Sequence, residues 1–218
     1  MSYRAILWDF GGVLTTSPFE AFNRYEAERG LPRDFIRGVN AVNHHDNAWA
    51  RFESSRIDEN EFDRQFRAET AAAGHEVPGH DVLGLLGGAV RPRMVAVLDR
   101  CKADYKVVCL TNNVKSGRGP GMANSSRHAA EIADVMARFD LVIESSKEGL
   151  RKPDPRIYVL ACERMQVAPE EVVYLDDLGV NLRPAREMGM TTIKVVSEAQ
   201  AIADLGQALG IAFGDGEA

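Results

Sequence analysis

Residues Val172-Val173-Tyr174-Leu175-Asp176-Asp177 decide the fold class. A short apolar run that ends in acidic residues is typical of a strand buried on both faces of a parallel sheet, with its carboxyl end at a ligand-binding edge. Two adjacent carboxylates at such a place repel each other, and a bound cation would relieve the repulsion. The pair could instead cap the following helix. We favour the cation site.

Further apolar runs have the same character, and patterns with helical spacing separate them. The other strands are expected at residues 5–8, 106–110, 141–143 and 191–196, and helices at residues 92–101, 132–139 and 157–165. Strands that alternate with helices form right-handed βαβ units. The sequence therefore predicts an α/β protein with a doubly wound, Rossmann-like parallel sheet in three layers.

Residues 16–88 break this alternation, because they contain no convincing strand. Ser17-Pro18-Phe19-Glu20 has the pattern of a capping box with proline at the first helical position, and Asp58 is expected to begin another helix. Because the segment leaves from the loop after the first strand, we predict a small helical cap over the site rather than helices that only extend the core. The expected domains are a catalytic core of residues 1–15 and 89–218 and a cap of residues 16–88.

Polar residues follow the predicted strands at the edge where ligands bind in open α/β sheets. Asp9 ends the first strand, and Gly11 and Gly12 allow a sharp turn whose backbone amides can face an anion. Thr111 and Asn112 follow the second strand with a hydroxyl and an amide fit to hold an oxyanion. Each pattern taken alone is also that of an ordinary strand-to-loop turn.

Two more clusters complete the set. Lys152 lies in a loop that two prolines stiffen just before a helix. Asp176 and Asp177 end the buried strand described above, and Asn181 follows them. A lone lysine is usually a solvated surface charge. In this fold, however, a carboxylate, an oxyanion cradle, a lysine and an acidic pair would converge in one crevice.

The order of these clusters resembles that of the four motifs of the haloacid-dehalogenase-like (HAD) hydrolase superfamily. The resemblance spans the chain, since the helical segment corresponds to the first type of cap in that family. It is most specific in LDDLGVNLRPAREMGM (residues 175–190) and RKPDPRIY (residues 151–158), which look very like the N-terminal phosphatase domain of soluble epoxide hydrolases. The resemblance implies a magnesium-dependent phosphatase that acts on a small phosphorylated metabolite.

The resemblance also implies roles for the acidic residues. Asp9 would be the nucleophile that attacks phosphorus and forms an aspartyl-phosphate. Mg²⁺ would bind an Asp9 oxygen, the backbone carbonyl of Gly11 and the Asp177 carboxylate. Asp176 and Asn181 would support these ligands from behind, although Asp176 could instead share the metal.

The phosphoryl oxygens would be held, by the same resemblance, by Thr111, the Asn112 amide and Lys152. One position departs from the family pattern. Phosphatases of this family usually place a second aspartate two residues after the nucleophile to protonate the leaving group, and here that position is Gly11. General acid–base help is typically worth ~10²–10⁴-fold, so we expect slower turnover without it.

Two other functions stay open. A 2-haloacid dehalogenase also uses an aspartate nucleophile but needs no metal, and the acidic pair argues against it by repelling a carboxylate substrate. A catalytically impaired regulatory module would keep phosphate and metal affinity without turnover. In the cap, residues 44–46 (His-His-Asp) could supply a replacement acid or form a solvated turn. Trp49, Arg51 and Phe52 could face the substrate, although aromatics at helical spacing more often belong to a core.

Composition favours a cytoplasmic protein that binds neither nucleic acid nor membrane. The net charge of −6 comes without a basic stretch that could neutralise several phosphates, and no run approaches the ~20 apolar residues that span a bilayer. Cys101, Cys109 and Cys162 lie in apolar runs, which indicates buried free thiols in a reducing compartment. We expect a small-molecule partner, a monomer or homodimer, a flexible loop at residues 117–121 and a disordered tail at residues 214–218.

Overall fold

The computed structural model describes residues 2–113 and 126–214. The loop expected at residues 117–121 and most of the expected tail, residues 215–218, lie outside these ranges. All pairings in the sheet are parallel, and the strand order is β3-β2-β1-β4-β5. The strands are β1 (Ala5–Trp8), β2 (Lys106–Thr111), β3 (Leu141–Glu144), β4 (Val172–Asp176) and β5 (Thr191–Lys194).

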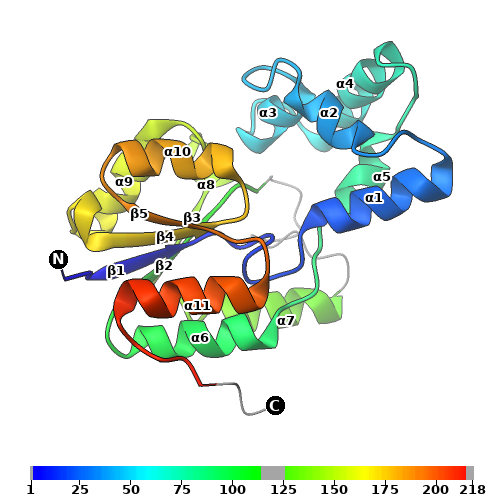
Figure 1. Cartoon of the computed structure of the whole chain (residues 1–218). Coiled ribbons are helices and arrows are strands. Elements are labelled where there is room, and N and C mark those ends of the chain that lie inside the picture. Colours follow the sequence, from blue (N-terminus) through cyan, green and yellow to red (C-terminus); the bar gives the residue numbers. More distant parts are fainter. Residues whose placement is uncertain (1, 114–125, 215–218) are drawn as a thin grey trace.

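Helices cover both faces of the sheet and make three layers (Figure 1). Helices α6, α7 and α11 pack on the face that carries Ile6 and Trp8, and α9 and α10 pack on the face that carries Ala5 and Leu7. The bounds are α6 (Pro92–Lys102), α7 (Ser126–Met136), α8 (Ser145–Glu148), α9 (Pro155–Met165), the 3₁₀ helix η1 (Pro169–Glu171), α10 (Gly179–Glu187) and α11 (Glu198–Leu209). The predicted doubly wound α/β fold is confirmed.

The point where the strand order reverses lies beside β1. This strand pairs with β2 on one side and with β4 on the other, with Trp8 opposite both Cys109 and Leu175. Side chains alternate between the faces of a strand, so Asp9 and Asp176, which come one residue later, point to the same face. The register therefore brings the ends of β1 and β4 together at the place where this fold binds ligands.

Residues between β1 and α6 form five helices, which lie to one side of the sheet in Figure 1. They are α1 (Pro18–Arg29), α2 (Phe35–Ala41), α3 (Ala48–Glu53), α4 (Glu59–Ala72) and α5 (Gly79–Gly84). A hydrophobic cluster of their own holds them together, with the Phe62 ring stacked 4.6 Å from Phe52 and 5.3 Å from Phe66. The division into a core and a cap stays a prediction.

Two connections join the helical segment to the sheet side by side. The Thr16 amide donates to the Ala89 carbonyl at 2.8 Å, and the Arg91 amide donates to the Leu14 carbonyl at 2.8 Å. The chain thus leaves and returns at one place, directly after the loop that begins with Asp9. Any shift of the five helices would be transmitted through this pair of connections.

Local details differ from expectation at two points. Ser17 caps α1 through the Phe19 amide at 3.4 Å rather than through Glu20, and its hydroxyl also donates to Asp177 at 3.3 Å. The fifth strand ends at Lys194 instead of residue 196, since Val196 is exposed and Ser197 already caps α11.

Two other expectations are met. Asp58 caps α4, where its side chain accepts from the Glu61 amide at 2.8 Å. Cys101, Cys109 and Cys162 are buried and free, as predicted. Among the helices of the described ranges, none is both long enough and apolar enough to cross a bilayer.

Candidate active site

Lys152 joins the two carboxylates at the ends of β1 and β4. Its Nζ atom lies 2.8 Å from Asp9 Oδ1 and 2.8 Å from Asp176 Oδ2. The lysine side chain is 1% exposed and that of Asp176 is 0% exposed. Two buried carboxylates on adjacent strands therefore share one buried ammonium group, which balances half of their charge.

Asp176 is the most heavily bonded residue of the group. Its Oδ1 accepts from the Leu178 amide at 2.8 Å, and the Asn181 side chain donates to both carboxylate oxygens at 3.0 and 3.1 Å. The Tyr174 hydroxyl also donates to it. With Lys152, these donors engage both oxygens, so Asp176 is built to anchor the site. Asn181 thus contacts Asp176, and its role behind a metal stays a prediction.

Asp177 faces the turn after β1. Its carboxylate packs against Gly12, where a Cβ atom would lie only 2.3 Å from Asp177 Oδ2. The φ angle of Gly12 is +77°, which side chains rarely adopt. Oxygen atoms of Asp9, Asp176 and Asp177 all lie within 4.8 Å of one another. Glycine is thus required at position 12 to bring Asp177 up to Asp9.

The electrostatics of this group favour a cation. Burial raises the pKa of the Asp9 carboxyl well above its ordinary value, and Asp176 and Asp177 raise it further against the opposing effect of Lys152. Burial and the neighbouring Asp176 raise the pKa of Asp177 to about 6. Burial alone would lower the pKa of Lys152, but Asp176 and Asp9 together hold it above its usual range. Three carboxylates against one ammonium leave negative charge that a divalent ion would offset.

The residues after β2 fix the lysine loop. The Asn112 side chain donates to the Lys152 carbonyl at 3.0 Å, and its oxygen accepts from the Lys152 amide at 2.9 Å. Asn113, which is 3% exposed, donates to Glu144 at 2.7 Å through its side chain and to Ser145 at 2.9 Å through its backbone. Thr111 is buried beside them. The Asn112 side chain therefore positions the Lys152 backbone.

A cavity of about 500 Å³ opens above these residues. Each residue expected to touch the phosphoryl group or the metal lines it: Asp9, Gly11, Thr111, Asn112, Lys152 and Asp177. Asn181 lines it too, whereas Asp176 lies behind the wall. Residues of α1, α2 and α3 form the opposite wall, so the cavity lies between the sheet and the helical segment.

The residues expected to face a substrate from the helical segment divide into two groups. Trp49 and His44 line the cavity, whereas Phe52 is buried in the hydrophobic cluster of the helices. Asp46 is turned away to bind Arg51 at 2.7 Å, and it also binds Arg56. Of the candidates for a replacement acid, His44 is thus the one at the cavity.

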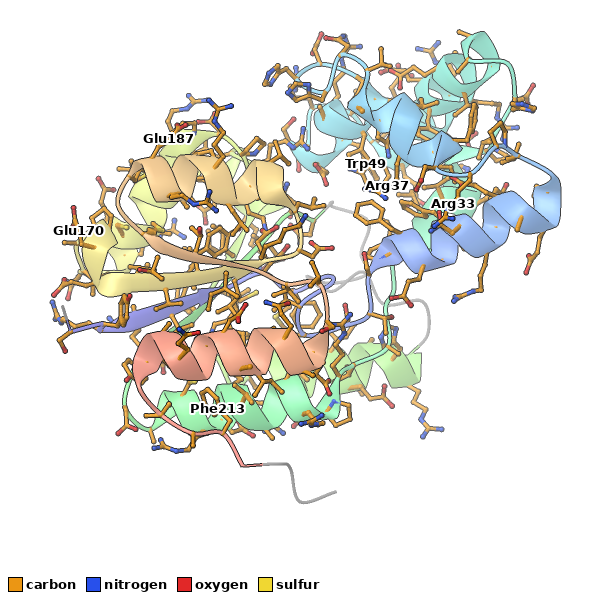
Figure 2. All side chains as sticks on the ribbon, in the orientation of Figure 1. Arg33, Arg37, Trp49, Glu170, Glu187 and Phe213 are labelled. Carbon is orange, nitrogen blue, oxygen red and sulfur yellow. The ribbon has the colours of Figure 1, made fainter. Side chains whose placement is uncertain are left out.

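Arg37 also lines the cavity, although the sequence pattern did not single it out. Figure 2 shows Arg37 and Trp49 on the helical segment, where the segment faces the sheet. Arg151 and Glu53 line the cavity as well. They form an ion pair in its side wall, with Arg151 Nη2 2.6 Å from Glu53 Oε2. Long-range contacts of this kind have no local sequence signal.

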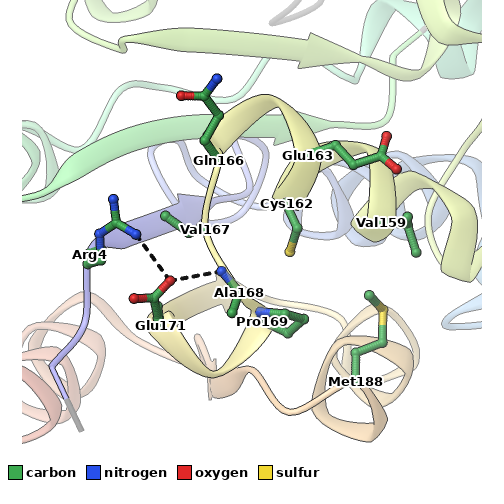
Figure 3. A pocket seen from close by; sticks show the side chains of 10 residues that line it. All are labelled: Arg4, Val159, Cys162, Glu163, Gln166, Val167, Ala168, Pro169, Glu171 and Met188. Atoms are coloured by element: carbon green, nitrogen blue, oxygen red, sulfur yellow. Dashed lines mark hydrogen bonds and ion pairs between the residues drawn. The ribbon is translucent and has the colours of Figure 1, made fainter.

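A second hollow lies at the other end of the sheet (Figure 3). It is open, and residues near the starts of β1 and β4 line it, among them Arg4 and Glu171, which bind each other at 3.4 Å. Cys162 lies there, and burial raises the pKa of its thiol to about 11. The raised pKa keeps this thiol protonated, and Arg4 is already paired with Glu171. The cavity above Asp9 is therefore the candidate active site.

A family model described as haloacid dehalogenase-like hydrolase matches residues 3–189. Mouse acyl-CoA dehydrogenase family member 10 is 32% identical over 220 residues, which cover 96% of this chain and 19% of that protein. Mouse bifunctional epoxide hydrolase 2 is 30% identical over 225 residues, which cover 98% of this chain and 40% of that protein. The chain thus spans less than half the length of these two relatives.

Other relatives match from end to end. Sesquiterpene phosphatase astK of Aspergillus oryzae is 23% identical over 211 residues, 96% of this chain and 98% of that protein. A HAD family enzyme of Bacteroides thetaiotaomicron, solved in complex with magnesium and inorganic phosphate, has a TM-score of 0.60 at 19% identity, covering 90% of this chain and 96% of that one. The resemblance read from the sequence motifs is confirmed by these matches.

Proposed function

Because the chain belongs to the haloacid dehalogenase-like hydrolases, we propose that it is a magnesium-dependent phosphatase of a small phosphorylated metabolite, with Asp9 as the nucleophile. The observation that carries the proposal is the contact of Lys152 with Asp9 and Asp176 at 2.8 Å each, at the floor of the cavity. A buried ammonium beside the nucleophile is suited to a phosphoryl group, which brings further negative charge. The name of the astK relative supports the same activity.

The reaction takes two steps. An Asp9 carboxylate oxygen forms a bond to phosphorus while the bond from phosphorus to the ester oxygen breaks, and the leaving alkoxide takes a proton from water. A water oxygen then attacks the aspartyl-phosphate, its proton passes to the hydroxide left by the first step, the bond from phosphorus to the Asp9 oxygen breaks, and inorganic phosphate leaves. Splitting the hydrolysis in this way restores the Asp9 carboxylate at the end of each cycle.

Three groups would hold the transferring phosphoryl oxygens: the Lys152 ammonium, the Thr111 hydroxyl and the Asn112 backbone amide. All three residues line the cavity with Asp9. The bonds of the Asn112 side chain to the Lys152 backbone fix the lysine before a substrate arrives. Such preorganised donors stabilise charge in the transition state without reorganising.

Magnesium fits the donor set, because hard carboxylate and carbonyl oxygens are the ligands it prefers. Asp9, the Gly11 carbonyl and Asp177 would hold it, with Asp176 and Asn181 behind them. When bound, the ion supplies positive charge that offsets the repulsion between the nucleophile and an anionic substrate. The close packing of Asp177 on Gly12 supports Asp177 as the direct ligand, because it turns this carboxylate toward Asp9.

Gly11 has no side chain that can transfer a proton, so another group must do so. The Cα of Gly11 faces open space, with no atom within 4 Å of a Cβ built there. His44, on the opposite wall of the cavity, is the candidate among residues 44–46 for donating the proton in place of water. Because general acid catalysis is worth ~10²–10⁴-fold, we expect slow turnover of esters with poor leaving groups.

Two alternatives are tested together with the proposal. A 2-haloacid dehalogenase would work without metal, and an impaired regulatory module would bind magnesium and phosphate without turnover. We further propose, from composition and the three free thiols, a cytoplasmic protein that acts as a monomer or homodimer on a small molecule and binds no nucleic acid. The five helices would act as a cap over residues 1–15 and 89–218.

The decisive experiment measures phosphate release from a broad panel of phosphomonoesters with magnesium and with EDTA, for the wild type and Asp9→Asn. The proposal expects release that needs magnesium and is lost in Asp9→Asn. Turnover of 2-chloropropionate that survives EDTA would favour the dehalogenase. Binding of magnesium and phosphate with no release from any ester would favour the regulatory module.

A further inference from the structure

Lys152 on the floor of the cavity and Arg151 on its side wall already have anionic partners within the protein. Lys152 neutralises part of the charge of Asp9 and Asp176. On the side wall, Arg151 and Glu53 neutralise each other at 2.6 Å, with side chains that are 23% and 10% exposed. Lys152 and Arg151 are therefore already paired with carboxylates of the protein.

Arg37 differs from them. Its guanidinium lies over the Phe19 ring, with the Cζ atom 4.3 Å from the ring centre, and both residues line the cavity. The ion pair of Arg37 with Asp34, at 3.1 Å, joins side chains that are 46% and 48% exposed. Pairs this exposed contribute little, about 0–1 kcal/mol. Asp34 is not among the cavity-lining residues, so a ligand in the cavity can replace Asp34 as the partner of the Arg37 guanidinium.

The helical segment gives the cavity a largely apolar wall. Phe19, Phe22, Trp49 and Leu86 line it together with the polar Asn40 and His44, and the rings of Phe19 and Phe22 lie 5.9 Å apart. The cavity thus offers a phosphoryl site at its floor, an apolar wall and one cationic group on that wall. A ligand that matches all three has an anionic group at each end and an apolar body between them.

We propose that the substrate is a phosphomonoester with an apolar body that ends in a second anionic oxygen group, and that Arg37 binds this group. The inference rests on the proposed phosphatase function and names the substrate class for it. Arginine binds carboxylate and phosphate with two parallel hydrogen bonds. Stacking on Phe19 restricts the guanidinium before binding, which lowers the entropy lost on binding.

The test uses straight-chain phosphonates, which present a phosphoryl group but have no ester bond to hydrolyse. Three series of increasing chain length end in a carboxylate, a second phosphonate or an uncharged carboxamide of the same size as the carboxylate. Calorimetry with magnesium present gives the Kd of each. In the wild type we expect one charged series to bind roughly 10- to 100-fold more tightly than the carboxamide at its best length, as for a charge-assisted hydrogen bond.

Arg37→Gln should remove this preference, and Arg37→Lys should keep part of it. Arg33→Gln is the matched control, because Arg33 pairs with the same Asp34 at 4.0 Å but has an 86% exposed side chain and does not line the cavity; Figure 2 shows both arginines. This variant should keep the full preference. Whichever charged series binds more tightly identifies the second group as carboxylate or phosphate.

Equal affinity for charged and uncharged ends at every length, or a preference that survives Arg37→Gln, would overturn the inference. Phosphate release from the corresponding phosphate esters is measured separately. A preference lost in Arg37→Gln supports the inference even where no ester is hydrolysed, and that absence of hydrolysis would count against the proposed phosphatase alone.

Discussion

Arg151 Nη2 lies 2.6 Å from Glu53 Oε2, so the residue before the buried lysine binds the last residue of helix α3. The same guanidinium donates to the His44 carbonyl at 3.1 Å. Nearby, the Ser145 hydroxyl donates to the Glu53 carbonyl at 3.3 Å. The helical segment is thereby attached to the loops that hold Asn113 and Lys152. Movement of α3 would therefore displace the loop that carries Lys152.

Glu53→Gln should loosen this attachment. The variant leaves the largely buried Arg151 guanidinium without its ion-pair partner, so amide exchange in residues 48–53 should become roughly tenfold faster or more. Hydrogen-exchange mass spectrometry measures the change. Glu187→Gln is the control, since it breaks an exposed pair with Arg183 on the far side of α10 and should leave residues 48–53 unchanged. Unaltered exchange in Glu53→Gln would mean that the ion pair does not help to hold α3.

Lys152→Met should destabilise the protein in the absence of metal. It leaves the buried carboxylates of Asp9 and Asp176 without their cation, which typically costs about 3–5 kcal/mol. The double variant with Asp9→Asn should recover part of the loss, because one of the two charges is gone. Urea unfolding in EDTA measures these free energies.

Excess magnesium should stabilise Lys152→Met more than it stabilises the wild type, because the ion would then be the main positive charge beside Asp9. Equal stability of the single and double variants would show that Asp9 and Lys152 are not coupled. Equal stabilisation of both proteins by magnesium would argue that the ion binds elsewhere.

Gly12→Ala should lower magnesium affinity strongly. The new Cβ would lie 2.3 Å from Asp177 Oδ2 at a φ of +77°, so the carboxylate must shift from its place beside Gly12. Gly11→Ala is a matched control at the adjacent position, where a Cβ meets no atom within 4 Å and the carbonyl is kept. Calorimetric titration with Mg²⁺ compares the two. Similar losses in both variants would contradict the role given to Asp177.

Gly11→Asp should speed the hydrolysis of esters with poor leaving groups, by up to ~10²–10⁴-fold. A Cβ atom at position 11 meets no atom within 4 Å, and the carboxyl group would supply the missing proton. Aryl phosphates with good leaving groups should gain much less, because their aryloxides need no proton to leave. The measurement is kcat for an alkyl and an aryl phosphate in each protein. A uniform gain, or none, would mean that another acid already acts or that product release limits turnover.

The sequence by itself determined the sheet and the order of the site clusters. Continuous apolar strands, such as residues 172–175, require burial on both faces, and a run of consecutive apolar residues is visible in the sequence itself. The positions of Asp9 and Asp176 at strand ends follow from the same pattern. The structure adds that β1 pairs with β4. Because side chains alternate along a strand, this pairing places both carboxylates on one face.

Only the tertiary structure decided which groups Asp176 and Asp177 each contact. Adjacent residues at a strand end point in different directions, so Asp176 turns inward to Lys152 and Tyr174 while Asp177 turns to Gly12. No local pattern shows which of the two meets a buried lysine from another loop, because that depends on how separate segments pack.

The same reason applies to the helical segment. Phe52 and Trp49 lie three residues apart on one helix, yet one is core and the other lines the cavity. The pairing of Glu53 with Arg151 joins residues that are far apart in the chain. The placement of Arg37 over Phe19 likewise depends on how α2 packs against α1. Periodicity predicts that a helix has a buried face, but packing against distant segments decides which residues at its edge meet a ligand.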